Sequence, residues 1–549
     1  MADPFITVAQ RLAPAFSSVA GEPADPVVRP SDRADAQANG ALSLAKSMGR
    51  QPREVAQAAL DAVGDLSDLL ESTEVAGPGF INLVFAKSFV TSGLAELAAD
   101  DRLGVRTVAT PRTVTVDYSA PNVAKEMHVG HLRSTVIGDS IVRTLMFVGH
   151  RVVRENHVGD WGTPFGMLIE HLIDLGEEEA AHELGVGDLD GFYKEARRKF
   201  EADPPFADRA RSRVVMLQQG DPETLRLWRT LVALSTGYFN KVYRQLDVLL
   251  TDDDLAGESM YNELLAPVVE RLRAAGLLVE SDGAEVVFPD GFTNRDGEPL
   301  PLIIRKGDGG YNYATTDLAC VIDRVERVGA GAMLYVVGSP QAQHLQMVEA
   351  VARRAGWLAD DVEFRHVAFG SVLGSDRKML KSRAGDTVKL SSLLDEAVER
   401  AAAAIAEKNP GMPADERAKV ARMVGIGSVK YADLSGDRIK DYVFDWDRML
   451  SFEGNTAPSK RMSAIASARS RGSSRTGSTV RTAARSMPAR RKIEQMRACA
   501  YCRYGAVWEA LDGYHPHRLC TYLWDLAGAF TSFYENCPVL RADDEHTRG

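Results

Sequence analysis

Two histidines at the predicted start of a helix are the residues of this chain best suited to chemistry. A strand-like run over 113–118 is followed by the turn Ser119-Ala-Pro-Asn122 and then by His128-Val-Gly-His131. Unpaired backbone NH groups and the positive end of the helix dipole favour an anion such as a phosphate at a helix N-terminus. Gly130 would let a nucleotide approach closely. The helix itself is predicted by apolar residues that recur about once per turn, namely Leu132, Val136, Ile137, Ile141, Leu145 and Val148.

A second chemical element is the pair of lysines in Lys378-Met-Leu-Lys381, inside a polar stretch bounded by Gly374 and Gly385. Two cations on a loop suit a reaction in which negative charge builds up on a departing pyrophosphate, because preorganised cations stabilise the transition state more than the ground state. Taken alone, both elements also occur on ordinary protein surfaces. Their order along one chain favours a nucleotide site.

The wider sequence around the histidines identifies a family resemblance. The run from Ser119 to Ser134, followed by Asn156-His-Val-Gly-Asp-Trp-Gly162, closely resembles the arginyl-tRNA synthetases, which are class I aminoacyl-tRNA synthetases. The two lysines resemble the second nucleotide motif of that family, although Leu380 replaces the Ser of the commonest form. The resemblance implies ATP-dependent attachment of L-arginine to tRNA(Arg) through an arginyl-adenylate, with Mg²⁺ assisting ATP.

An arginine pocket can be argued from residue types. A guanidinium is planar and permanently charged, so it needs a carboxylate that accepts bidentate hydrogen bonds and an aromatic or amide neighbour. Tyr313 and Asp317 are one helical turn apart, so they would share one helix face. The resemblance makes both of them contacts of the arginine side chain. Without it they would be interpreted as an ordinary helix start, with Asp317 in a local salt bridge. The other substrate-binding residues implied by the resemblance are Asn122, His131, Asn156 and Gln341.

The expected mechanism is in-line attack of the arginine carboxylate on the α-phosphorus of ATP. His128 and His131 would hydrogen-bond the phosphoryl oxygens, and Lys378 and Lys381 would neutralise the leaving pyrophosphate. These four side chains are the predicted catalytic residues, and no metal-ligating side chain is predicted. The residues that the resemblance assigns to ATP binding are His128, Gly130, His131, Lys378, Met379 and Lys381.

Length and pattern predict several domains, because 549 residues exceed one ordinary core. We expect an N-terminal α+β tRNA-binding domain over 1–100. A catalytic domain with a Rossmann-like, doubly wound α/β sheet is expected over 101–392, where strand and helix patterns alternate. A helical anticodon-binding domain is expected over 393–549, since apolar residues there have helical spacing.

Composition agrees with a globular enzyme, at 45% hydrophobic and 26% charged residues. No run of about 18 apolar residues suggests a membrane span, and the N-terminus lacks the pattern of a secretory signal. The expectation is a cytoplasmic protein, and the resemblance implies a monomer. Five cysteines are too few for a disulfide framework, and Cys499-x-x-Cys502 has no second pair to complete a zinc site.

The charge is unevenly distributed. The net charge is −11, but 459–503 holds twelve Lys or Arg against the single Glu494, a contribution of +11, so the rest carries −11 − 11 = −22. A local basic excess on an acidic protein is compatible with tRNA binding, because the potential at the contact surface decides affinity.

The stretch from Ser459 to about Cys502 is anomalous, because its Ser/Arg/Ala/Gly/Thr mixture lacks any helical or strand period. We hypothesise that it is frame-shifted and that the C-terminus is truncated relative to the family. The rival interpretation is a disordered, arginine-rich RNA arm. Two other functions stay open at this point. They are a small-molecule nucleotidylyltransferase, which also uses a His-x-Gly-His turn, and a non-catalytic or impaired tRNA-binding paralogue.

Overall fold

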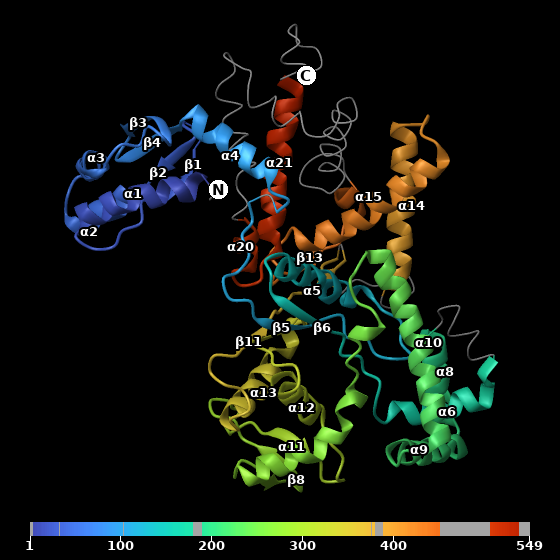
Figure 1. Ribbon diagram of the computed structural model, residues 1–549. Coiled ribbons are helices and arrows are strands. Elements are labelled where there is room, and N and C mark those ends of the chain that lie inside the picture. The colour runs from blue at the N-terminus through green and yellow to red at the C-terminus, as the bar shows by residue number, and fades with distance from the viewer. Residues whose placement is uncertain are drawn as a thin grey trace. The chain divides into compact units, whose positions relative to one another are not determined.

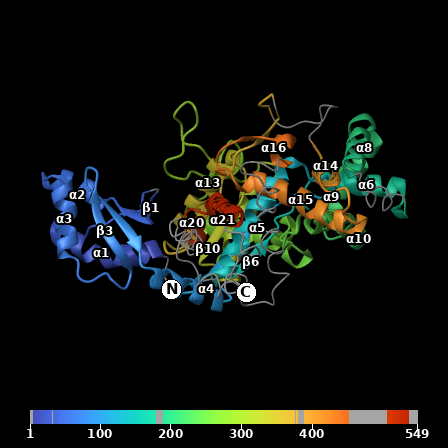
Figure 2. The same ribbon diagram turned by 90° about the horizontal axis from the view of Figure 1, so that it is seen from above.

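The chain divides into two structural units in the computed structural model, which describes residues 4–31, 33–102, 104–178, 189–374, 376–378, 388–450 and 506–536. The larger unit is Thr107–Ser451, and the smaller unit comprises Met1–Arg106 with Phe452–Gly549. Each unit is described by itself, with its elements labelled in Figures 1 and 2.

The larger unit is built on a parallel sheet with the strand order β11-β10-β5-β6. Its strands are β5 (Thr113–Asp117), β6 (Arg151–Glu155), β10 (Ala332–Tyr335) and β11 (Glu363–His366). β10 is buried at every position and β5 at all but its first, as expected for strands covered on both faces. The predicted doubly wound α/β sheet is therefore confirmed.

Three helices make the connections of this sheet, and they are α5 (Val129–Phe147), α12 (Tyr313–Glu326) and α13 (Ala342–Arg354). α5 crosses from β5 to β6 as predicted, beginning directly after His128 and ending just before Gly149, which has a φ of 95°. α12 precedes β10, and α13 joins β10 to β11 through the short helix η3 (Ser339–Gln341). The residues that end β5 and β10 and begin α5 and α12 therefore gather at the carboxyl edge of the sheet, where open α/β sheets bind ligands.

A helical insertion follows β6. It contains α6 (Pro164–Leu175), α8 (Leu189–Ala202), α9 (Pro204–Gln218) and α10 (Pro222–Leu246), then η1 (Asp252–Asp254), η2 (Glu258–Tyr261) and α11 (Asn262–Ala274). α10 starts where Asp221 caps it, accepting a hydrogen bond from the backbone NH of Thr224. A small antiparallel sheet, β7 (Val279–Ser281), β8 (Ala284–Val287) and β9 (Leu302–Arg305), returns the chain to α12.

The last part of the larger unit is mainly helical. It contains β12 (Val372–Leu373), α14 (Leu390–Lys408), α15 (Ala414–Leu434), β13 (Tyr442–Val443) and α16 (Trp446–Leu450). α15 packs against α14, and their shared apolar cluster includes Ala401, Ile405, Ala421 and Val424. β12 and β13 pair in parallel, which ties the segment after α15 to the segment before the lysines.

The smaller unit begins with the predicted N-terminal α+β fold. Its helices are α1 (Pro4–Ala20), α2 (Gly40–Met48), α3 (Pro52–Ala62) and α4 (Lys87–Ala99). Its strands β1 (Val28–Pro30), β2 (Ala36–Ala38), β3 (Leu70–Ala76) and β4 (Phe80–Phe85) form an antiparallel sheet in the order β1-β2-β4-β3. Alternate residues of β4 are buried, namely Ile81, Leu83 and Phe85, and they pack on Val8, Leu12 and Phe16 of α1.

Two further helices of the smaller unit, α20 (Ala506–Leu511) and α21 (Pro516–Asn536), pack on each other. The anomalous stretch 459–502, with Cys499 and Cys502, lies outside the described residues, as do Met379 and Lys381. Within the described part of the chain, no helix is both long enough and apolar enough to span a membrane.

The contact between α5 and the end of β5 can be tested by adding one methyl group. A Cβ at Gly138 would lie 2.5 Å from Cγ of the buried Tyr118, whereas a Cβ at Gly237 of α10 would meet no atom within 4 Å. Gly138→Ala should lower stability by about 1–3 kcal/mol through overpacking. Gly237→Ala should raise it by up to about 1 kcal/mol through helix propensity. Thermal unfolding followed by circular dichroism measures both, and equal melting temperatures would contradict the packing described.

Candidate active site

The two predicted histidines form the N-terminal cap of α5. His128 is the N-cap residue, and its Nδ1 accepts a hydrogen bond from the backbone NH of Gly130 at 3.0 Å. The Nδ1 of His131 accepts one from the backbone NH of His128, also at 3.0 Å. The two ring centroids are 4.0 Å apart. A Cβ at Gly130 would lie 2.8 Å from the His128 ring, so a larger residue there would have to displace that ring.

These contacts determine what the imidazoles can donate. An Nδ1 that accepts a hydrogen bond carries no proton, so a neutral ring with this contact carries its proton on Nε2. Burial lowers the pKa of His128, and burial together with the adjacent His128 lowers the pKa of His131 to about 3. Both rings are therefore neutral near pH 7 and offer one N–H donor each. Such donors suit phosphoryl oxygens.

The turn between β5 and α5 has an unusual backbone. Ser119, Ala120 and Ala124 have positive φ angles of 76°, 48° and 57°. A side chain disfavours this region by about 1–3 kcal/mol for each residue, so surrounding contacts must hold it. The backbone NH groups of these three residues donate to Ser134 Oγ, Asn156 Oδ1 and Ser235 Oγ at 2.9–3.0 Å.

Asn156 and Asn122 differ in their burial and in their hydrogen bonds. Asn156 is buried, and its Nδ2 also donates to the Tyr243 hydroxyl at 3.0 Å, so both of its amide atoms bind protein groups. We interpret Asn156 as a support for the turn. Asn122 is exposed and forms a parallel bridge with Gly159, and Val123 NH donates to Gly159 carbonyl at 3.0 Å. Asn122 thus stays available to a substrate.

The second pair of predicted residues begins α12. The Asn312 side chain caps the helix by accepting from the backbone NH of Tyr313 at 2.9 Å. The Tyr313 side chain is 62% exposed, and its ring lies 4.6 Å from that of His344. His344 Nε2 contacts Asp317 Oδ2 at 2.5 Å. The structure therefore brings Tyr313 and Asp317 together around His344 of α13, while Gln341 lies exposed one turn earlier, where α13 begins.

Sequence analysis gave His344 no role, and it missed Glu258 altogether. Glu258 begins η2, and its backbone NH donates to Val158 carbonyl at 3.1 Å. Burial raises the pKa of Glu258 to about 7, with His157 opposing this shift and the charges of Asp160 and Asp317 adding to it. The charges of Asp160 and Asp317 thus act on Glu258, and we call these three carboxyl groups the acidic cluster. The local sequence carries no signal for it.

We call the stretch from Gly374 to Val388, which carries Lys378 and Lys381, the lysine loop, and the turn with His128 and His131 the histidine turn. The residues at the C-terminal end of the lysine loop contact the histidine turn. Val129 NH donates to Val388 carbonyl at 3.1 Å, and Leu390 NH donates to Met127 carbonyl at 2.8 Å. His128 and Lys389 form the antiparallel bridge between these bonds. Of the loop itself, Lys378 is described, and its carbonyl accepts from Gly374 NH at 2.8 Å. The predicted residues Met379 and Lys381 lie outside the described residues.

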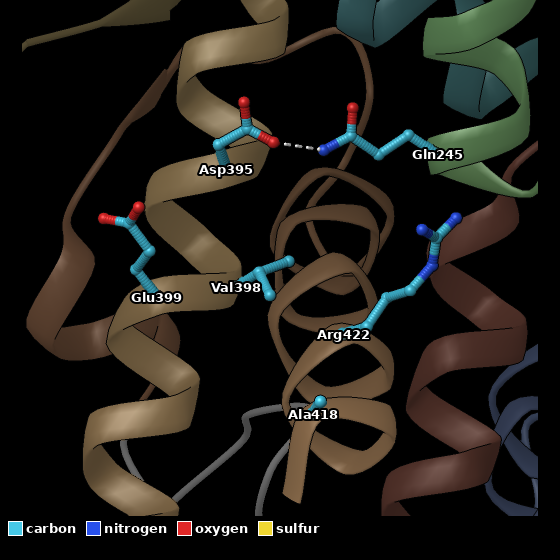
Figure 3. A pocket seen from close by; sticks show the side chains of 6 residues that line it. All are labelled: Gln245, Asp395, Val398, Glu399, Ala418 and Arg422. Atoms are coloured by element: carbon cyan, nitrogen blue, oxygen red, sulfur yellow. Dashed lines mark hydrogen bonds between the residues drawn. The ribbon is translucent and has the colours of Figure 1, made fainter. Parts of the chain in front are cut away.

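A separate hollow lies between α10, α14 and α15 and has a volume of about 450 Å³. Figure 3 shows the six residues that line it, with Gln245 Nε2 donating to Asp395 Oδ1 at 2.8 Å. None of these six belongs to the predicted site. The hollow is therefore not assigned a part in its chemistry.

Comparison with known proteins identifies the family. The model of the "tRNA synthetases class I (R), catalytic domain" matches residues 94–446, that of the "Arginyl tRNA synthetase N terminal domain" matches 7–85, and that of the "DALR anticodon binding domain" matches 499–548. The arginine–tRNA ligase of Thermobifida fusca is 52% identical, over 100% of this chain and 95% of its own length. That of Cronobacter sakazakii is 49% identical, over 96% and 92%.

Solved structures agree with this assignment. The arginyl-tRNA synthetase of Plasmodium falciparum has a TM-score of 0.80 at 26% identity, covering 100% of this chain and 95% of its own. The Thermus thermophilus enzyme has a TM-score of 0.78 at 23% identity, covering 99% and 95%, and shows the same fold. With a catalytic-domain match over most of its length and relatives about half identical to it, the chain belongs to the class I arginyl-tRNA synthetases.

Proposed function

We propose that this protein is an active arginine–tRNA ligase, which forms arginyl-adenylate from L-arginine and ATP and transfers the arginyl group to tRNA(Arg). Family membership supports the activity. The observation that carries the site assignment is the antiparallel contact between 127–129 and 388–390, which draws the end of the lysine loop to the histidine turn. A nucleotidylyltransferase or a non-catalytic paralogue would lack arginine-dependent exchange of pyrophosphate into ATP.

In the proposed mechanism the arginine carboxylate attacks the α-phosphorus in line with the departing pyrophosphate. His128 and His131 donate their Nε2 protons to phosphoryl oxygens, and Lys378 and Lys381 neutralise the leaving group. The donors that the turn leaves for phosphate oxygens are the two imidazole Nε2–H groups, because the backbone NH groups of His128 and Gly130 already donate to the imidazoles. Mg²⁺ bound with ATP would supply further charge neutralisation on the phosphates.

The acidic cluster provides the proposed arginine pocket. Asp317, held by His344, accepts the guanidinium, and Tyr313 and Gln341 border the side chain. Glu258 adds a second carboxylate close to Asp317. A site built around these half-buried carboxylates rejects citrulline, because a neutral ligand leaves the charges unpaired.

The rest of the proposal concerns the tRNA-binding domains, the location of the protein in the cell and its oligomeric state. The N-terminal unit over 1–100 and the helical region over 393–549 are the proposed tRNA-binding domains around a catalytic domain over 101–392. The family matches at 7–85 and 499–548 support the two outer domains, whereas the catalytic-domain match runs from 94 to 446, past the proposed boundary at 392. We further infer a cytoplasmic monomer. The third match begins at residue 499, close to the end of the anomalous stretch.

The histidine turn can be tested by removing one donor. His131→Ala should lower kcat/KM for arginine activation by about 10² to 10³, the range for loss of one charge-stabilising donor. Exchange of pyrophosphate into ATP, with tRNA present, measures this step. His150→Ala is the matched control, because His150 also accepts a backbone hydrogen bond, from Arg112 NH, but outside the site. Unchanged exchange in His131→Ala would remove the role.

The arginine pocket can be tested at Asp317. Asp317→Asn should raise the KM for arginine by about 10²-fold or more, through loss of the charge-assisted bidentate contact, while the KM for ATP changes little. Glu326→Gln on the same helix is the control, since its carboxylate pairs with Arg271 on the surface. If arginine KM and discrimination against citrulline both stayed as in the wild type, another group would have to bind the guanidinium.

The pH dependence follows from Glu258. Because burial raises its pKa to about 7, Glu258 is mostly protonated at pH 6 and mostly ionised at pH 8. A guanidinium binds the ionised form, so arginine KM should fall about ten-fold between pH 6 and pH 8. Glu258→Gln should abolish this slope, while the KM for ATP serves as an internal control. The same slope in Glu258→Gln would assign it to a different group.

A further inference from the structure

Arg133 is a buried arginine that the mechanism does not use. It lies on α5, two residues after His131, and its side chain is 2% exposed. Its Nε donates to Asp433 Oδ1 of α15 at 2.8 Å. Its Nη1 donates to two backbone carbonyls, Gly370 at 2.7 Å and Lys440 at 3.1 Å. One side chain therefore joins the helix of the histidine turn to three other segments.

Two of these segments form the base of the lysine loop. Gly370 NH donates to Arg438 carbonyl at 2.9 Å, and the β12–β13 ladder follows, pairing Val372 with Tyr442. A Cβ at Gly370 would lie 2.7 Å from the backbone nitrogen of Asp441, so the two segments are in close contact. β12 runs directly into the stretch that carries Lys378. Arg133 thus binds the backbone just before the loop begins.

The buried ion pair between Arg133 and Asp433 is not arranged in the way that would best stabilise the fold. Burial raises the pKa of Asp433 to about 6, although the charge and hydrogen bond of Arg133 oppose the shift. Among the described residues, Asp433 Oδ2 and the buried hydroxyl of Tyr442 have no hydrogen-bond partner. Removing two charges from water costs much of what their attraction returns. The guanidinium instead fixes the relative positions of its hydrogen-bond partners, because its donors lie in one rigid plane.

Both ends of the loop are consequently fixed to the start of α5, by different means. The far end pairs through its backbone at 388–390 with 127–129. The near end is held through Arg133. We propose that Arg133 is a positioning residue for adenylate formation, which sets the place of the Lys378 loop relative to His128 and His131. This inference rests on the function proposed above.

The proposal predicts which kinetic constant changes. The lysines act on charge that develops as pyrophosphate leaves, so a displaced loop lowers kcat. The arginine pocket is formed by α12, α13 and η2, none of which Arg133 contacts through the hydrogen bonds described. The KM for arginine should therefore stay close to the wild-type value.

The first test is Arg133→Lys, which keeps the charge but cannot reach Asp433 and both carbonyls with one ammonium group. In pyrophosphate exchange with tRNA present, kcat should fall about 10- to 100-fold, as expected for a misplaced catalytic group. The KM for arginine should change less than about two-fold. Arg143→Lys is the matched control, because Arg143 lies on the same helix and also pairs with a buried carboxylate, that of Asp139, but contacts neither Gly370 nor Lys440 through the hydrogen bonds described.

A second variant separates positioning from stability. Arg133→Met combined with Asp433→Leu removes both buried charges, so the melting temperature of this double variant should lie near the wild-type value. The carbonyl contacts remain absent, so kcat should stay low. If kcat instead recovers together with the melting temperature, Arg133 is only structural and the proposal is overturned.

The outcomes also distinguish this inference from the function on which it rests. Wild-type protein without arginine-dependent exchange would reject the proposed function. Active wild type with a normal kcat in Arg133→Lys would overturn the positioning role alone. Active wild type with reduced kcat, unchanged arginine KM and no rescue in the double variant would support it.

Discussion

The candidate site depends on one backbone contact between segments far apart in the sequence, the antiparallel pairing of 127–129 with 388–390. Lys389 strengthens it by donating to Glu126 Oε1 at 2.7 Å. The pairing uses the start of α5, where the positive end of the helix dipole favours negative charge. The backbone NH groups of residues 128–131 are already hydrogen-bonded within the protein. A phosphate bound there would meet the neutral imidazole donors of His128 and His131.

The carboxylates of Asp117 and Glu155 need a compensating charge nearby, because carboxylates repel one another when buried. Arg324 of α12 provides it for the ends of the two central strands. Its guanidinium is fully buried and donates to Glu155 at 2.6 Å and to Asp117 at 2.8 Å. Arg324 lies two turns along the helix from Asp317. The strand-end carboxylates are thus paired with Arg324, whereas Asp317 contacts His344.

Much of the fold could be predicted because its signals are local. Apolar spacing in 132–148 predicted α5, and Gly149 marked where it ends. The one-turn spacing of Tyr313 and Asp317 predicted a shared face, and both side chains do meet His344. The amide of Asn156 is buried and hydrogen-bonds the turn and Tyr243. The sequence alone could not predict whether this amide would be buried in the protein or open to a substrate. The basic stretch 459–502 has no local period, so sequence patterns gave no structure for it.

The amino-acid sequence by itself determined the family, the order of strands and helices and the two nucleotide motifs, because periodicity and short motifs act within a few residues of one another. Only the tertiary structure decided that the charge of Asp317 acts on Glu258, that His344 holds Asp317 and that Arg133 joins α5 to the base of the lysine loop. Each of these contacts connects segments that are distant along the chain. Their geometry arises when β5, α12 and α15 pack, and no local pattern records it.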